Sequence, residues 1–444
     1  MKLGNIVGSS TFRVFTITGL ILILLIPMKM IESLIRERGN LYRQVNDEVM
    51  ASWGKDQWIT GPVISLPYLK QNTEQGIWTY DTLYKHIRPR TLDIDISIDT
   101  QLRYRSIYEV LLYNAHVKLN GTYNLSDISY NDNESTEFEI IEGFIQVPMG
   151  DPKAVKEIIT FTWDGIELEK NPNFLGTNKQ DVTIFSEIDP EMLNREEVHK
   201  FSLEYIINGS GEVNFITNST QTRLQLDANW GFPGFYGNYL PDVHSIDNDK
   251  FTARWNVNEL LGGIGHDTVQ YLSPDLLSPQ SHYGVRFVQS VDTYQQVMRS
   301  AKYAVLIISL AFLVYFFTEI MTRLYLHPIQ YILVGGVNCV FYLLLLSLAE
   351  HINFIYAYLV SAGASVLIVT LYSLSILKSR RYAAVIFCLL GALYSYLYIT
   401  LNSKAYALVI GSIGLFGILS LLMYLTRDVD WNRVNPKITI KTTP

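Results

Sequence analysis

The residue types that most often carry out chemistry are sparse and scattered in this chain. Its eight histidines stand at positions 86, 116, 199, 244, 266, 282, 327 and 351. None has a second histidine four residues away, and no His-Glu-x-x-His segment occurs, so the helical zinc-binding pattern is absent. The two cysteines, Cys339 and Cys388, both lie in apolar runs. We therefore predict no metal site, and no disulfide in the long polar segment that precedes them.

Other patterns for catalysis are also missing. The segment Asn208–Gly211 holds a serine between glycines, but it lacks the Gly-x-Ser-x-Gly spacing of a nucleophile elbow, and a hairpin turn is favoured. The neighbours His266 and Asp267 resemble half of an acid–base pair, for which a solvated loop is the favoured interpretation. No glycine-rich phosphate-binding loop is present. We expect no catalytic residue and no cofactor, and hence a protein that is not an enzyme.

The distribution of charge separates the chain into two kinds of segment. Only 17% of the 444 residues are charged, whereas ordinary soluble domains carry about 25%. Residues 32–300 hold 22 Lys or Arg against 38 Asp or Glu, and the rest of the chain holds 13 against 4. An acidic central segment thus lies between basic, apolar ends. This distribution disfavours nucleic acid as a partner, and the apolar ends favour the lipid bilayer.

Six apolar stretches are long enough to cross a bilayer, which takes about 20 mostly apolar residues. They are Phe12–Ile31, Lys302–Thr318, Ile329–Ala349, Phe354–Leu377, Tyr382–Leu401 and Ala405–Thr426. If the N-terminus is cytoplasmic, most basic residues outside the central segment fall on the inner side, and the short outer loops are nearly free of them. We predict six transmembrane helices, both termini in the cytoplasm, and residues 32–300 outside.

The first apolar stretch predicts an uncleaved anchor, because its core is as long as a span and no small-x-small cleavage pattern follows. Beyond it, apolar residues keep a helical spacing, so the anchor helix is predicted to continue over about 32–54. The expected organisation is a cytoplasmic N-terminus and anchor over 1–31, an external β-rich domain over 32–300, a five-helix bundle over 301–426 and a cytoplasmic tail over 427–444.

Alternation of apolar and polar residues dominates the central segment and is typical of strands. It is clearest over 92–99, 201–207, 224–230 and 251–257, with breaks expected at Asn120-Gly121 and Asn208–Gly211, and a long irregular connection over 259–283. One apolar and one polar face per strand indicate antiparallel sheets. The predicted fold class is an α+β membrane protein with an antiparallel, sandwich-like domain, formed as one sandwich or as two lobes.

Polar residues near the ends of the apolar stretches are the only candidate site. They are Glu319, Arg323, His327, Pro328, Gln330 and Tyr331 at the predicted inner end of the second and third spans, and Glu350 and His351 at the outer end of the third. Glu319 and Arg323 are expected to form an i, i+4 ion pair, and Pro328 is expected to start a helix. A polar clasp between the two spans is favoured, and a cytoplasmic docking or proton-sensing site is the alternative.

Four blocks along the chain resemble the CreD family of bacterial inner-membrane proteins. They are Gly61–Pro67, Asn229–Phe235 with Leu240-Pro241, Val291–Tyr294 with Arg299–Ala304, and His327–Gly335 continuing through Phe341–His351. The blocks stand in family order over nearly the whole chain, so the resemblance is specific. The chain departs from the family at Trp230–Pro233, where Trp-Gly-Phe-Pro replaces the family's Trp-Pro-His-Pro, so any role for that family histidine is absent here.

The resemblance implies a Gram-negative inner-membrane protein with a large periplasmic domain, linked to cell-envelope integrity and often to a two-component regulatory system. It implies no reaction and no catalytic residue. The leading hypothesis is a non-enzymatic protein whose β-rich domain binds an envelope component, a lipid or a protein. A transporter or lipid-handling protein that works through the helix bundle is the alternative, and a periplasmic hydrolase is a third. The lack of charge at the helix centres favours the first.

Overall fold

Two compact units make up the chain. The computed structural model describes residues 10–74, 77–125, 143–149, 151–169, 171–173, 182–193, 197–258, 282–287, 293–322, 326–403 and 407–427. One unit, Met1–Arg43 with Val291–Pro444, is helical in its described residues, and the other, Gln44–Ser290, is rich in strands. The predicted α+β class with a β-rich domain is confirmed.

The helices follow the apolar stretches of the sequence. Within the described residues they are α1 (Ser10–Trp53), α2 (Thr293–Lys302), α3 (Ala304–Thr322), α4 (Pro328–Ala349), α5 (Phe354–Leu377), α6 (Arg380–Asn402) and α7 (Ala407–Thr426). Helix α1 is 44 residues long and runs through Pro27 to Trp53. It is therefore one continuous helix from the apolar anchor into the β-rich unit, as the apolar spacing beyond residue 31 indicated.

Four of these helices are long and apolar enough to cross a membrane. They are Arg13–Trp53, Pro328–Ala349, Phe354–Leu377 and Arg380–Asn402. Helices α2 and α3 meet at an angle of 46° around Tyr303, and they add a fifth span if the bent pair crosses as one. The six predicted spans thus have four clear counterparts in the part of the chain that the structure describes.

A glycine on α4 lets three helices of the helical unit approach closely. On this helix Val334 and Phe341 are buried, seven residues apart on one face. Gly335 lies beside Val334. A Cβ placed on it would collide with the Leu24 side chain of α1 and would crowd the ring of Phe312 of α3. Small residues allow this kind of contact between membrane helices. Gly335 is therefore a point of close helix packing in the helical unit.

The strands of the other unit range from 2 to 17 residues. They are β1 (Gln57–Thr60), β2 (Val63–Glu74), β3 (Ile77–Ile87), β4 (Thr91–Arg105), β5 (Tyr108–Asn124), β6 (Gly143–Met149), β7 (Val155–Trp163), β8 (Ile166–Glu167), β9 (Asn171–Asn173), β10 (Val182–Ile188), β11 (Val198–Ser210), β12 (Glu212–Ile216), β13 (Gln221–Ala228), β14 (Pro233–Gly237), β15 (Val243–Asp247), β16 (Lys250–Asn258) and β17 (His282–Phe287). Two 3-10 turns, η3 (Pro152–Ala154) and η4 (Pro190–Met192), connect some of them.

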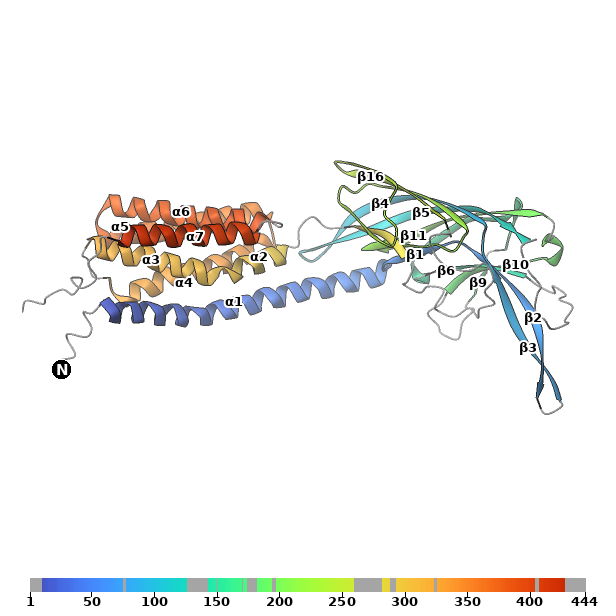
Figure 1. Ribbon diagram of the computed structural model, residues 1–444, viewed down its shortest axis with the longest axis horizontal. Helices are drawn as coiled ribbons and strands as arrows, with labels where there is room; N and C mark the ends of the chain where they lie inside the picture. The colour runs from blue at the N-terminus through green and yellow to red at the C-terminus, as the bar shows by residue number, and fades with distance from the viewer. Residues whose placement is uncertain are drawn as a thin grey trace, which may run out of the picture. The chain divides into compact units, whose positions relative to one another are not determined.

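The strands pair into three sheets (Figure 1). Their orders are β15-β16-β13-β4-β5-β11-β7-β8, β3-β2-β6-β10-β9 and β1-β12-β17-β14. Most pairs are antiparallel as predicted, but β4 with β13 and β1 with β12 are parallel, which corrects the purely antiparallel expectation. Both parallel pairs join segments far apart in the sequence, where a long connection and not a hairpin returns the chain.

A single hydrophobic core lies among the three sheets. Its buried residues include Ile94 of the eight-stranded sheet, Ile145 of the five-stranded sheet and Val213 of the four-stranded sheet. The alternation that predicted the strands is visible in β4, where Leu92, Ile94, Ile96 and Ile98 are buried and the residues between them face outward. Among the described residues the three sheets thus share one hydrophobic cluster.

The predicted break at Asn120-Gly121 is wrong, because both residues lie within β5. Gly121 pairs with Leu92 of β4 on one side and with Phe201 of β11 on the other. A Cβ at Gly121 would collide with the backbone carbonyl of Thr91 and with the ring of Phe201. This glycine therefore makes room for an aromatic side chain within a continuous strand, and does not mark a turn.

The segment Asn208–Gly211 also differs from the predicted hairpin. Strand β11 ends at Ser210, Gly211 adopts a left-handed φ of 68°, and β12 begins at Glu212 in another sheet. The turn thus moves the chain from the eight-stranded to the four-stranded sheet. The irregular connection predicted over 259–283, with His266 and Asp267, lies outside the described residues except for His282 and Tyr283, which begin β17.

His86 on β3 is a half-buried histidine that contacts a polar group of the neighbouring strand. Its Nδ1 lies 2.8 Å from Ser65 Oγ, which also accepts a hydrogen bond of 2.7 Å from Gln146 Nε2. Burial lowers the pKa of His86 to about 4, below the value of about 6.5 expected in the unfolded chain. Below about pH 6.5 the unfolded state binds a proton that the folded state does not, so acid destabilises the domain until His86 itself titrates.

We predict that His86→Gln reduces the loss of thermal stability on acidification from about pH 6.5 to about pH 4, because it removes this titration. The measurement is the unfolding temperature of the purified protein, followed by circular dichroism across that range. His244→Gln, a change at an exposed histidine on β15, is the matched control and should keep the wild-type slope. An unchanged slope in His86→Gln would contradict the assignment.

Candidate functional site

Helix α4 begins at the residue that the sequence indicated. Pro328 is its first residue, and His327 is the N-cap in an extended conformation. The Ile329 N–H donates to His327 Nδ1 over 3.4 Å, and the His327 N–H donates to Gln330 Oε1 over 3.0 Å. These two side chains form a capping box, which satisfies backbone groups that lack partners within the helix. His327 is exposed, and its side chain caps the first turn of α4.

Glu319 of α3 is buried and contacts two other helices. Arg13 Nη1 of α1 lies 2.9 Å from Glu319 Oε1, and the Tyr331 hydroxyl of α4 donates to Glu319 Oε2 over 2.9 Å. One carboxylate thus links three helices. Arg323, the partner expected from the i, i+4 spacing, lies outside the described residues. Sequence reasoning missed Arg13 because 306 positions separate it from Glu319.

Glu350 and His351 lie at the other end of α4. Glu350 is the C-cap of the helix, and the Tyr294 hydroxyl of α2 donates to its Oε1 over 3.1 Å. His351 follows in the turn and is exposed. The described candidate residues therefore fall into two groups at opposite ends of one helix, and the structure does not bring them into one site.

We predict that Tyr331→Phe lowers the stability of the helical unit by about 1 kcal/mol, because it removes an interhelical hydrogen bond to Glu319. The measurement is thermal unfolding of the detergent-solubilised protein. Tyr356→Phe is the control, since Tyr356 on α5 is 65% exposed and its hydroxyl holds no helix pair together in the described residues. Equal stabilities for the two variants would show that the contact to Glu319 contributes nothing measurable.

A second polar cluster, which the sequence did not reveal, forms where α1 enters the β-rich unit. Gly54 follows the last residue of α1 with a φ of 146°, a conformation that side chains with a Cβ rarely adopt. The Ser210 hydroxyl donates to the Gly54 carbonyl over 2.7 Å. The Glu212 N–H donates to the Asp56 carboxylate over 3.0 Å. These contacts bring the start of β1 beside the start of β12, and the two strands continue in parallel.

The register of the four-stranded sheet places six side chains on one face. Trp58, Asn214, Gly284 and Tyr236 lie opposite one another in one row across β1, β12, β17 and β14. Residues two positions away on the same strands share that face, because the side chains of a strand alternate. We call the resulting set the polar–aromatic face; it consists of Trp58, Glu212, Asn214, Tyr236, His282 and Arg286.

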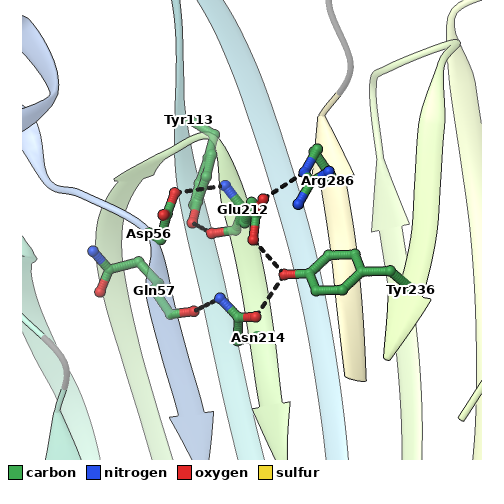
Figure 2. Close-up of polar contacts among 7 residues, drawn as sticks. All are labelled: Asp56, Gln57, Tyr113, Glu212, Asn214, Tyr236 and Arg286. Carbon is green, nitrogen blue, oxygen red and sulfur yellow. Dashed lines mark hydrogen bonds and ion pairs between the residues drawn. The ribbon is translucent and has the colours of Figure 1, made fainter. Parts of the chain in front are cut away.

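Tyr236 connects the polar groups of this face (Figure 2). It reaches across β17 at Gly284, and its hydroxyl lies 2.6 Å from Glu212 Oε2 and 2.5 Å from Asn214 Oδ1. Arg286 Nε donates to Glu212 Oε1, and the Arg286 Cζ lies 5.2 Å from the centroid of the Tyr236 ring. The carboxylate, the amide and the guanidinium are therefore held in fixed positions around one phenol.

Electrostatics keep these groups in defined protonation states. Burial, followed by the nearby Glu212 carboxylate, raises the pKa of Asp56 above its ordinary value. Burial and then the hydrogen bond to Glu212 raise the pKa of Tyr236. The hydrogen bond to Glu212 also raises the pKa of Arg286. At neutral pH Tyr236 is thus a neutral donor and Arg286 a cation that balances the charge of Glu212.

Aromatic rings continue the face toward β1. The His282 ring centroid lies 5.4 Å from that of Trp58 and 6.2 Å from that of Tyr236, both edge to face. These three rings are half-buried, whereas the side chains of Glu212 and Arg286 are 23% and 59% exposed. Among the described residues no group of three His, Cys, Asp or Glu side chains could hold a metal ion. Aromatic rings beside a few fixed polar groups are typical of a surface that binds a ligand.

The fold and its charge pattern define a class: a membrane protein with a helical unit, one long connecting helix and a β-rich domain. The chain belongs to the CreD family, because the family model described as "Inner membrane protein CreD" matches residues 9–432. The inner membrane protein CreD of Escherichia coli (strain K12) is 26% identical over 431 residues, covering 95% of this chain and 93% of that protein. The family resemblance is confirmed, and with it a multi-pass inner-membrane location.

Two solved structures show weak likenesses to this chain. An M1 zinc metallopeptidase from Deinococcus radiodurans has a TM-score of 0.22 and 8% sequence identity, covering 38% of each chain. Native yeast LTA4 hydrolase has a TM-score of 0.21 and 7% identity, covering 51% of this chain and 35% of that chain. TM-scores this low support no conclusion about fold or activity.

Proposed function

We propose that this chain crosses the inner membrane six times and places its β-rich domain, residues 32–300, in the periplasm. There the domain helps to maintain the cell envelope by binding an envelope component, without catalysing a reaction. The observation that carries the proposal is the polar–aromatic face, where Glu212, Tyr236 and Arg286 are fixed by one another and still reach solvent. A preorganised polar surface of this kind loses little entropy on binding.

The short turns of the helical unit support the proposed orientation. The turn between α5 and α6 holds Lys378, and Arg380 and Arg381 open α6, whereas the turn over Glu350–Asn353 between α4 and α5 has no Lys or Arg. Basic residues concentrate on the cytoplasmic side of inner-membrane proteins. Helix α7 covers the last predicted span, so α1, the bent pair α2 and α3, and α4 to α7 make up six crossings in this proposal.

The buried polar groups of the helical unit favour a structural role over a transport pathway. Asn338 of α4 accepts a hydrogen bond of 2.7 Å from the Tyr394 hydroxyl of α6 and donates one of 2.9 Å to the Val334 carbonyl. The Tyr358 hydroxyl of α5 donates to the Tyr394 carbonyl over 2.7 Å. These groups satisfy one another, and neutral polar contacts of this kind commonly hold membrane helices together.

Cysteine labelling tests the orientation. In a background that carries Cys339→Ser and Cys388→Ser, we predict that Thr252→Cys and Ile352→Cys react with an impermeant maleimide in intact spheroplasts. Ser379→Cys should react only after the membrane is broken. All three positions lie outside the hydrophobic cores, and Ser379 makes no side-chain capping bond that the change would remove. Labelling of Ser379→Cys in intact spheroplasts, with protection of Thr252→Cys, would reverse the topology.

Complementation tests the role. In a deletion strain of the native host, we predict that Tyr236→Phe combined with Arg286→Ala fails to restore the envelope barrier, measured as retention of a periplasmic reporter enzyme under detergent stress. The variant loses the hydroxyl and the guanidinium that organise Glu212. Arg254→Ala, at an exposed arginine on the eight-stranded sheet, should restore the barrier fully. Protein abundance and cysteine labelling should be equal for both variants.

The bundle alternative makes the opposite prediction for the same assay. If the helical unit carries the activity, Asn338→Leu should abolish complementation while Tyr236→Phe with Arg286→Ala restores it. That result, with normal insertion of the Asn338→Leu protein, would replace the proposed binding function by a transport or lipid-handling function.

A further inference from the structure

The geometry points to a neutral oligosaccharide as the ligand of the polar–aromatic face. This inference rests on the proposed function, because it names the envelope component that the periplasmic domain binds. It depends on three properties of the face: its rings, its planar polar groups and its charge balance.

The rings form a stripe across the sheet. Trp58 stands on β1 and Tyr236 on β14, the two edge strands of the sheet. His282 stands on β17, one of the two strands between them, and its ring lies beside both rings. With neighbouring strands about 4.8 Å apart, a stripe over four strands is about as long as two or three sugar rings. Aromatic faces offer apolar area with little conformational freedom, which suits the C–H faces of pyranose rings.

The planar polar groups stand beside this stripe. The Glu212 carboxylate and the Arg286 guanidinium each carry two or more hydrogen-bonding atoms in one plane, and both reach solvent. Such groups can bond to two adjacent hydroxyls of one sugar. The Tyr236 hydroxyl and Arg286 fix the carboxylate, and the carboxylate in turn fixes Arg286, so both groups are positioned before a ligand arrives (Figure 2). Asn214 is only 2% exposed and serves to hold Tyr236 in place. The Gln57 carbonyl accepts from Asn214 Nδ2 over 3.5 Å and so steadies the amide that contacts Tyr236.

Charge selects among polar ligands. Arg286 already pairs with Glu212, so the described side chains of the face offer no uncommitted guanidinium or ammonium group to an anion. The nearby Asp56 carboxylate, which accepts from the Glu212 N–H, adds negative charge. Residues 32–300 carry an excess of acidic side chains. An anionic lipid headgroup or free phosphate would therefore be repelled. The binding of a neutral, hydroxyl-rich ligand carries no such electrostatic penalty.

Direct binding tests the assignment. The full-length protein is purified in a detergent without a sugar headgroup, and chitotetraose, maltotetraose and inorganic phosphate are titrated by isothermal calorimetry. We expect at least one tetrasaccharide to bind with a Kd below about 1 mM, and phosphate not to bind. Saturation-transfer NMR should show contacts from protein to the pyranose C–H protons. Binding of phosphate, or of neither tetrasaccharide, overturns the assignment.

Variants locate the binding to the face. Tyr236→Phe keeps the ring and removes the hydroxyl, and it should weaken binding about tenfold, the loss expected for a hydrogen bond to a charged group. Trp58→Leu should abolish the saturation-transfer signal. Arg254→Ala is the control and should bind like wild type, and thermal unfolding checks that each variant is folded. Wild-type tetrasaccharide binding by both Tyr236→Phe and Trp58→Leu would place the ligand elsewhere and overturn the proposal.

The two proposals fail in different ways. If neither tetrasaccharide binds but Tyr236→Phe with Arg286→Ala still loses the envelope barrier, the saccharide assignment is wrong and the proposed function stands. If a tetrasaccharide binds through Trp58 and Tyr236 but the same variant restores the barrier, the saccharide assignment stands and the proposed function is wrong.

Discussion

The β-rich domain depends on the burial of one phenol, Tyr113 of β5, between two sheets and the end of α1. Its hydroxyl donates to the Glu212 carbonyl over 2.9 Å, and its own carbonyl accepts from the Trp53 indole over 3.2 Å. Gly209 leaves the space for the ring, and the Phe287 ring lies 5.3 Å away. A buried hydroxyl without a partner costs about 1–3 kcal/mol, so this contact requires the strands on both sides to be in register.

The polar–aromatic face is built on the same contact. The backbone of Glu212 holds the fold, since its carbonyl accepts from Tyr113 and its N–H donates to Asp56. The side chain of Glu212 organises the surface through Tyr236 and Arg286. One residue therefore serves stability through its main chain and binding through its carboxylate. Substitutions of the carboxylate can separate the two roles, whereas backbone changes at this position cannot.

Local sequence patterns predicted the helices and strands, whereas the candidate sites are formed by residues that are far apart in the sequence. Alternation predicted β4 and β16 because one side of each strand is buried, and Pro328 predicted the start of α4 because its ring suits the first turn. The face escaped prediction because its six residues come from four strands with no common local signal. Gly121 was misjudged for the same reason: the Phe201 ring that requires a glycine there belongs to another strand.

The strand order of the four-stranded sheet sets the sequence of events during synthesis. Strand β17 lies between β12 and β14, yet it is the last of the four in the chain. Strand β1 cannot pair until β12 has been synthesised. At about 5–20 residues per second, synthesis of the chain between them takes on the order of 10–30 s. The sheet then stays open along one side until residues 282–287 have been made. Nearly the whole domain must therefore be synthesised before the free edge of β12 is covered by β17. Such non-local pairing slows folding.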